Sequence, residues 1–435
     1  MVTRPIRISS VDAYEILDSR ARPTLRVLLR AEDGRTASAG VPAGASTGRK
    51  EAVELRDGDH ARYGGQGVLR AVASVTGEIA DLLTDRTWAD QESLDAALIN
   101  LDGTENRARL GANAVVGVSV AAARLFADDL PLWRYFGRSP DRRTVAPRLP
   151  VPHFNVLNGG AHARNELDFQ EFMIAPLGAH TMADAIRCGA EIYTALRRLL
   201  SELGYDTGLG DEGGFAPQVT QPEQALGLLV KAIEHAGYPV GVNGVAVAID
   251  PAASQFYQED GSYLINGQRH TSSELVARYV ELVRDYPLWS IEDGMAEDDP
   301  AGWSLLYREL GEHVQIMGDD VFVTDSGLIA AGAKADMANS ALIKLNQVGT
   351  VTETLHAIQT CRDNNMTAMV SHRSGETEDD FIADLAVGCG CGQLKAGAPA
   401  RGERVAKYNR LLAIARQDPT LPYGLPESAS ARRVS

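Results

Sequence analysis

Cysteine is scarce in this chain, which carries four thiols among 435 residues. Cys389 and Cys391 form the closest pair, and the single residue between them does not fit a zinc ribbon or a redox-active Cys-x-x-Cys motif. Few, scattered thiols in a chain of this length predict a reducing compartment. Residues 1–8 also lack the apolar core of a secretory signal. We therefore expect a cytoplasmic protein.

Long apolar runs and an excess of positive charge are also absent. No stretch is apolar over the length that a membrane-spanning helix needs. The 42 basic and 58 acidic residues give a formal net charge of -16, which argues against binding to nucleic acid or an anionic membrane. The composition, 44% hydrophobic and 23% charged, is that of an ordinary globular protein. We expect no membrane and no nucleic-acid partner.

A segment with three prolines, 147–152, divides the chain into two parts. Before it, a strand pattern at 24–30, a small-residue loop at 41–48 and helical patterns at 67–84 and 112–127 indicate a mixed α+β domain. The last residues are small and polar, as in disordered termini. We predict an α+β domain, a larger second domain and a disordered tail, at residues 1–143, 144–425 and 426–435.

The second part shows a regular alternation of short apolar runs and helical patterns. Each run ends in a charged or polar side chain, and these are Asp250, Glu292, Asp319, Lys344, His372 and Lys395. One such unit roughly every 25 residues predicts a (β/α)₈-type barrel, whose active site lies at the carboxyl ends of the strands. A single run could be a buried strand with an incidental polar end, but six in series favour one common rim.

The longer gap after Asp250 contains an inserted segment. Residues 263–270 carry an Asn-Gly pair, at Asn266 and Gly267, between two short extended patterns. This pair is typical of a tight hairpin turn. We expect a small flap there.

Three of the strand-end groups are carboxylates: Asp250, Glu292 and Asp319. Placed together they would repel one another and raise each other's pKa, unless a cation compensated them. Ligation by oxygen alone points to Mg²⁺, or to Mn²⁺, rather than to zinc. The alternative is a set of rim acids paired with arginines.

Other groups would complete an elimination reaction. Near a divalent cation the neutral form of Lys344 is favoured, and a neutral amine is a general base. Glu212, in the Gly-Asp-Glu-Gly-Gly-Phe segment, would be the acid if nearby carboxylates help it to hold a proton. Arg373 and Lys395 suit an anionic substrate, although either alone could form a surface ion pair.

Many dispersed segments, in order along nearly the whole chain, resemble the enolase family. They lie at 15–20, 44–48, 54–59, 110–114, 158–162, 170–173, 210–217, 290–293, 318–320, 342–347, 371–379 and 404–409. The resemblance implies a capping domain followed by a modified barrel that begins ββαα, usually as a homodimer. It also implies a lyase that dehydrates a small phosphorylated carboxylate with two Mg²⁺ ions.

The resemblance assigns roles residue by residue. Asp250, Glu292 and Asp319 match the ligands of the first Mg²⁺, and Ser46 matches the clamp on a second, substrate-assisted Mg²⁺. Lys344 matches the base, and Glu212 matches the acid. The remaining matches are to groups around the substrate, with Glu171 supporting the acid: His162, Gln170, Glu171, His372, Arg373, Ser374 and Lys395.

The chain departs from the family pattern near its loops. Where the family usually reads Ser-Arg-Gly-Asn-Pro, this chain has Ala21 and Arg22, and Arg164 stands in the loop around His162 where a small or acidic residue is common.

Three readings follow. The chain is a glycolytic enzyme that dehydrates 2-phospho-D-glycerate to phosphoenolpyruvate; it is a paralogue for an analogue with an extra anionic group, such as one forming carboxyphosphonoenolpyruvate; or it is a noncatalytic binding protein on the same fold.

Overall fold

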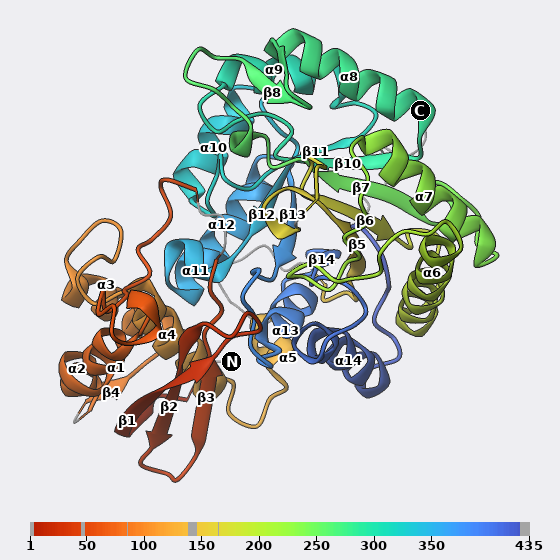
Figure 1. Cartoon of the computed structure of the whole chain (residues 1–435). Helices are drawn as coiled ribbons and strands as arrows, with labels where there is room; N and C mark the ends of the chain where they lie inside the picture. The colour runs from red at the N-terminus through yellow and green to blue at the C-terminus, as the bar shows by residue number, and fades with distance from the viewer. Residues whose placement is uncertain (1–3, 45–47, 85, 138–145, 164, 427–435) are drawn as a thin grey trace.

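The computed structural model describes residues 4–44, 48–84, 86–137, 146–163 and 165–426. Ser46, Arg164 and nearly all of the predicted tail lie outside these residues. Two lobes are evident in Figure 1, a smaller one built from the N-terminal elements and a larger one built around a barrel. This arrangement confirms the predicted α/β architecture of an α+β capping domain and a (β/α)₈-type barrel.

The N-terminal lobe is a four-stranded sheet covered by helices. Its strands have the order β3-β2-β1-β4. They are β1 (Ile6–Leu17), β2 (Pro23–Ala31), β3 (Thr36–Gly40) and β4 (Thr87–Trp88). Its helices are α1 (Leu69–Ser74), α2 (Ala80–Leu83), α3 (Gln91–Asp102), α4 (Ala112–Ala127) and α5 (Leu132–Phe136).

Helix α4 packs directly on this sheet. A β-carbon at Gly117 would lie 2.7 Å from Val27 and 2.9 Å from Val41, so the helix needs glycine there to approach so closely. Nearly every side chain of α4 is buried, because the helix also contacts α11 and α12 of the larger lobe. This helix therefore joins the core of the small lobe to that of the large one.

The larger lobe is a closed barrel with the strand order β10-β11-β12-β13-β14-β5-β6-β7. Its strands are β5 (Val151–Asn158), β6 (Glu171–Ala175), β7 (Ala246–Asp250), β10 (Leu288–Glu292), β11 (Gln315–Gly318), β12 (Ser340–Ile343), β13 (Thr367–Ser371) and β14 (Gln393–Lys395). Only β6 runs against its neighbours, so the barrel begins ββαα as the resemblance implied.

Helices surround the barrel, as Figure 1 shows. They are α6 (Met182–Glu202), α7 (Pro222–His235), α8 (Ser272–Asp285), α9 (Pro300–Leu310), α10 (Ser326–Lys334), α11 (Leu345–Val348), α12 (Val351–Asp363), α13 (Phe381–Gly388) and α14 (Gly402–Gln417). The expected flap is the hairpin of β8 (Tyr263–Ile265) and β9 (Gln268–His270), with Asn266 at its turn in a left-handed conformation of φ 50°.

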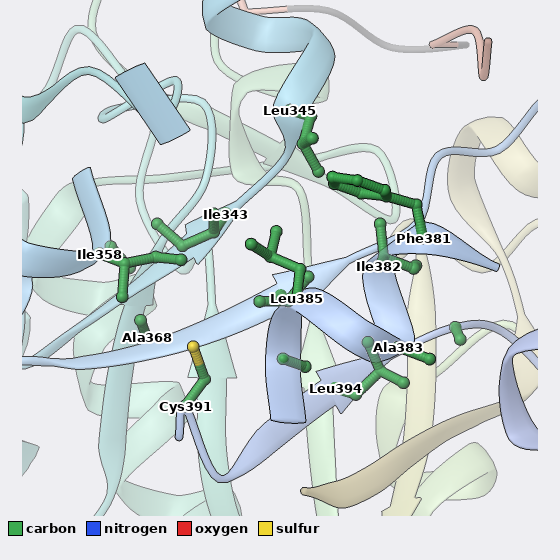
Figure 2. Close-up of a cluster of buried hydrophobic side chains, with 14 of the residues drawn as sticks. Ile343, Leu345, Ile358, Ala368, Phe381, Ile382, Ala383, Leu385, Cys391 and Leu394 are labelled. Carbon is green, nitrogen blue, oxygen red and sulfur yellow. The ribbon is translucent and has the colours of Figure 1, made fainter. Parts of the chain in front are cut away.

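The core lies between the strands and this helical layer. Figure 2 shows side chains of β12, β13 and β14 meeting those of α12 and α13, among them Ile343, Ile358, Leu385 and Leu394. The barrel strands are buried along their whole length, as expected for strands covered on both faces. No described helix combines the length and apolar character needed to cross a membrane.

Polar contacts fix the small lobe on the rim of the barrel. The guanidinium of Arg124 on α4 donates to Asp379 at 2.8 Å, and the Gly40 amide donates to the same carboxylate at 3.0 Å. At a second point the buried Asp95 carboxylate accepts from Ser119 and, across the lobe boundary, from Thr352, both at 2.6 Å. These buried, fully bonded contacts hold the lobes in one register.

Candidate active site

The six strand-end groups meet at one rim of the barrel, as the alternation predicted. Asp250, Glu292 and Lys395 are the last residues of their strands, and the other three, Asp319, Lys344 and His372, directly follow theirs. Strand β6 runs in the opposite direction, so its first residue, Glu171, reaches the same rim, where it pairs in register with Asp250.

Loops bring the remaining predicted residues to this rim. Glu212 lies between α6 and α7, His162 ends a short 3₁₀ turn after β5, and Gln170 precedes β6. A small cavity at the centre is lined by His162, Gln170, Glu171, Glu212, Asp250, Asp319, Lys344, Ser371, His372, Arg373, Ser374 and Lys395. The structure thus brings together every predicted site residue that it describes, since Glu292 adjoins the cavity through Lys395. Ser46 lies outside the described residues.

Lys395 is surrounded by acids. Its ammonium lies 2.9 Å from Glu171 Oε2, 3.2 Å from Asp250 Oδ2 and 2.9 Å from Glu292 Oε1. All four side chains are buried. Burial by itself would lower the pKa of Lys395, but Glu171 and the other carboxylates raise it well above its usual value. The amine is therefore a fixed positive charge.

Lys344 and Arg373 have acidic partners of their own. The Lys344 ammonium contacts Asp319 Oδ2, while Gln347 donates to Asp319 Oδ1 at 2.9 Å. The fork of Arg373 meets both oxygens of Glu51, a residue of the small lobe, with its nearest contact at 2.9 Å. The small lobe therefore contributes a charged group directly to the site.

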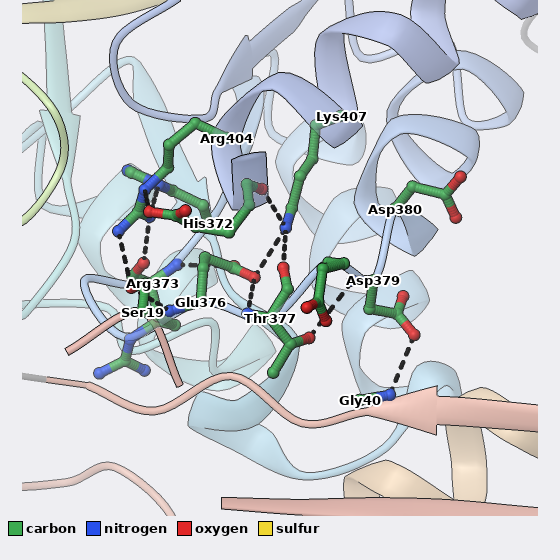
Figure 3. A network of polar contacts seen from close by, with 12 residues as sticks. Ser19, Gly40, His372, Arg373, Glu376, Thr377, Asp379, Asp380, Arg404 and Lys407 are labelled. Carbon is green, nitrogen blue, oxygen red and sulfur yellow. Dashed lines mark hydrogen bonds and ion pairs between the residues drawn. The ribbon is translucent and has the colours of Figure 1, made fainter. Parts of the chain in front are cut away.

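Arg404, on α14, organises the loop after β13. Figure 3 shows its guanidinium against His372 and Arg373. It contacts His372 Nδ1 at 2.5 Å and donates to the carbonyls of Arg373 at 2.7 Å and Ser374 at 2.6 Å. Because a guanidinium only donates, Nδ1 must accept, and the ring hydrogen then sits on Nε2. Nε2 lies 3.1 Å from Glu212 Oε2.

Family models cover most of the chain. A model described as Enolase, N-terminal domain matches residues 8–136, and one described as Enolase, C-terminal TIM barrel domain matches residues 146–419. The chain belongs to the enolase family. Relatives named enolase include those of Rubrobacter xylanophilus, 53% identical over 411 residues, Beutenbergia cavernae, 53% over 409, and Acidothermus cellulolyticus, 54% over 409. Each alignment covers 94% of this chain and 94% of the relative. These names favour the first of the three readings.

In this member of the enolase family the pKa values of Glu212 and Glu171 are shifted in opposite directions. Burial would raise the pKa of Glu212, but the imidazoles of His372 and His162 hold it well below its usual value. Burial, reinforced by Glu212, raises the pKa of Glu171 well above its usual value. The sequence argument counted carboxylates around Glu212, whereas the structure places His372 3.1 Å from Glu212, and Lys395 and His162 2.9 Å and 3.5 Å from Glu171.

The histidines differ from solvated imidazoles. Burial lowers the pKa of His372 to about 3, against the opposing effect of Glu212, and burial also lowers the pKa of His162. His162 Nε2 lies 3.3 Å from the Ser374 hydroxyl, which links the loop after β5 to the loop after β13.

The predicted base is paired with a carboxylate. Burial would lower the pKa of Lys344, but Asp319 raises it above its usual value. The neutral amine that the sequence argument assumed beside a cation stays a prediction.

The donor set fits a hard divalent cation. The rim carboxylates are buried, supply only oxygen, and are compensated by the two lysines, so the site demands positive charge. Among the described residues, the groups of three whose ligand atoms lie within 4.8 Å of one another are Asp293, Asp319 and Asp320, and His162, Glu171 and Glu212. Asp250 and Glu292 belong to neither, since Lys395 lies between them.

Several contributors were missed from sequence. Asp293 and Asp320 each follow a predicted ligand, and the doublets Glu-Asp and Asp-Asp at strand ends were the available signal. Asp293 accepts from the amides of Asp319 at 2.8 Å and Asp320 at 2.9 Å, so it fixes the end of β11. Glu51 gave no local signal, and Arg404 lay in the segment 404–409 that resembles the family but was given no role, because each acts on a distant segment.

Proposed function

We propose that this chain is a magnesium-dependent hydro-lyase that reversibly dehydrates 2-phospho-D-glycerate to phosphoenolpyruvate. One observation carries the proposal. In the strand order of the barrel, β12 and β6 lie four places apart among eight, so Lys344 and Glu171 face each other across the rim. An anti elimination needs a base and an acid on opposite faces of its substrate. The names of the relatives support the same reaction.

Lys344 is the proposed base. Its amine, once it has released its proton and its contact with Asp319, removes the proton next to the substrate carboxylate. The negative charge that develops there is met by Lys395, which keeps its own proton because three carboxylates surround it.

Glu171 and Glu212 act as the proposed acid pair. Their oxygens and a nitrogen of His162 lie within 4.8 Å of one another, so the two carboxylates and the imidazole form one group. This group is the proposed source of the proton that goes to the departing hydroxyl. Asn155 donates to Glu212 Oε2 at 3.0 Å and steadies its carboxylate.

Asp250, Glu292 and Asp319 are the proposed ligands of one Mg²⁺, and the substrate together with Ser46 would hold a second. Bound magnesium supplies positive charge that offsets the charge developing on the substrate carboxylate. Arg373 and Ser374 are the proposed contacts of the phosphoryl group, because a guanidinium fork matches phosphate oxygens. Gln170, His162 and His372 complete the contacts to the substrate.

The test separates the two proton transfers. Lys344→Ala should abolish both dehydration and exchange of the substrate's C2 proton in D₂O. Glu212→Gln should abolish dehydration and retain that exchange, because the base is intact. Proton NMR follows the exchange and ultraviolet absorbance follows the enol phosphate. Dehydration at the normal rate by the Lys344 variant would refute the assignment of the base.

A cytoplasmic, glycolytic homodimer is the proposed setting. The scarcity of cysteine supports the compartment, and the family resemblance supports the dimer. Sedimentation of the purified full chain tests the assembly.

A further inference from the structure

A second cavity adjoins the active site between the two lobes. It has a volume of about 480 Å³. Arg373 lines both this cavity and the small cavity at the barrel rim, so the two border the same side chain, the proposed phosphoryl contact. Among the described residues that line this cavity, Arg373 alone has a role in the proposed reaction.

Positive side chains dominate the walls of this second cavity. The guanidinium groups on its lining belong to Arg22, Arg49, Arg56 and Arg373, and the acids to Glu51 and Glu54. Three of the arginines are already neutralised by acidic partners. Arg373 pairs with Glu51, Arg56 pairs with Glu54, and Arg49 pairs with Glu297 outside the cavity.

Arg22 is the exception. In the part of the chain that the structure describes, its guanidinium has no hydrogen bond and no ion pair, and the residue is exposed. A free guanidinium on the wall of a cavity, beside partners whose charges already cancel, leaves one net positive charge for an anion.

The turn that carries Arg22 is ordered by its own sequence. The Asp18 carboxylate accepts from the amides of Arg20 at 2.8 Å and Arg22 at 2.9 Å, and Ala21 adopts a left-handed φ of 58°. Burial lowers the pKa of the Arg20 guanidinium, and the nearby charge of Arg22 acts in the same direction. Asp18 is the one acid that pairs directly with Arg20 among the described residues, and two neighbouring guanidinium groups favour an additional negative group.

We propose that this cavity is an anion-binding extension of the active site, in which Arg22 recognises a second negatively charged group attached at the phosphorus end of the substrate. The proposal rests on the proposed function, since it takes Arg373 as the phosphoryl contact. The ligand class is a glycerate whose phosphoryl group carries a further phosphate or carboxylate. Arg22 is thus a specificity-determining residue.

The experiment compares two analogues of equal extension and different charge. D-glycerate 2-diphosphate carries the extra anionic group, and the methyl ester of 2-phospho-D-glycerate at phosphorus does not. Their inhibition constants against 2-phosphoglycerate turnover are measured at fixed free Mg²⁺, because the diphosphate binds that ion. We expect the diphosphate to bind at least about tenfold more tightly than the methyl ester.

Variants then test whether Arg22 causes the preference for the diphosphate. Arg22→Asn should reduce the ratio of the two inhibition constants to roughly twofold or less, and Arg22→Lys should retain most of that ratio, since charge is the recognised property. Arg30→Asn, an exposed arginine on β2 away from the cavity, should leave the tenfold preference intact. Equal inhibition constants in the wild type, or a preference that survives Arg22→Asn, would overturn the proposal. Absence of all 2-phosphoglycerate turnover would instead contradict the proposed function.

Discussion

Replacing Lys395 by methionine tests the electrostatic core of the site. The ammonium lies within 3.2 Å of Asp250 and closer still to Glu171 and Glu292, and all four groups are buried. Removing one partner of a buried ion pair costs about 3–5 kcal/mol, because it leaves charge without compensation. Methionine keeps the volume of the side chain, so a cavity adds little to this cost.

The loss of unfolding free energy in Lys395→Met should depend on pH and on magnesium. Burial raises the pKa values of Glu171 and Glu292, so protonation can neutralise them in mild acid, and the destabilisation should be smaller at pH 5 than at pH 8. Magnesium supplies the missing charge. A ligand present at a hundredfold excess over its dissociation constant raises the free energy of unfolding by about 2.7 kcal/mol. We expect Mg²⁺ to raise the free energy of unfolding of the variant more than that of the wild type.

Urea titrations followed by tryptophan fluorescence, in chelator and in Mg²⁺, measure both effects. Lys334→Met, at the exposed end of α10, is the matched control and should change the free energy of unfolding by less than about 0.5 kcal/mol. A loss below about 1 kcal/mol for Lys395→Met in chelator at pH 8 would refute the reasoning. An equal increase in the free energy of unfolding on adding Mg²⁺ to the variant and to the wild type would also refute it.

Two further predictions concern neighbouring groups. Arg404→Lys keeps the positive charge, but one ammonium cannot reach His372 and both carbonyls of the loop after β13. We therefore expect kcat to fall by about tenfold to a hundredfold while the circular dichroism spectrum is retained. An unchanged kcat would show that the loop needs no guanidinium. Burial and Asp319 raise the pKa of Asp320 to about 8. Because this pKa is higher in the folded state than in the unfolded chain, the group's contribution to stability is fully present at a pH below the unfolded pKa. It is lost as the pH rises through the folded pKa of about 8. In chelator, urea midpoints of Asp320→Asn should therefore fall less than those of the wild type between pH 5 and 8, and parallel curves would contradict the shift.

The rim of the barrel could be predicted from sequence because its signal is local. Each apolar run marks a strand, and the polar residue at its end marks the strand's carboxyl terminus. Barrel closure then places Asp250, Glu292 and Lys344 together without further information. The hairpin at Asn266 was predictable for the same reason, since a two-residue turn depends on the residues within it.

The contacts at the lobe boundary could not be predicted from local sequence. Glu51 meets Arg373 across more than three hundred residues, and Arg404 meets His372 from another helix. Nothing in the sequence next to Glu51 distinguishes it from a surface charge, and the segment 404–409 does not by itself indicate what Arg404 contacts. Their partners are set by how the small lobe and α14 dock on the barrel, and docking depends on the whole packed surface.

Charge state is the property that sequence reasoning placed least well, and the acid pair shows why. Glu171 and Glu212 are the same residue type, both buried, and within 4.8 Å of each other through the group that includes His162. What separates their pKa values is the set of neighbours that each carboxylate faces. Glu212 faces His372, whose ring Arg404 orients, whereas Glu171 faces Lys395 and feels the charge of Glu212 and Asp250. A proton is therefore assigned by contacts among five or more segments, which no single motif encodes.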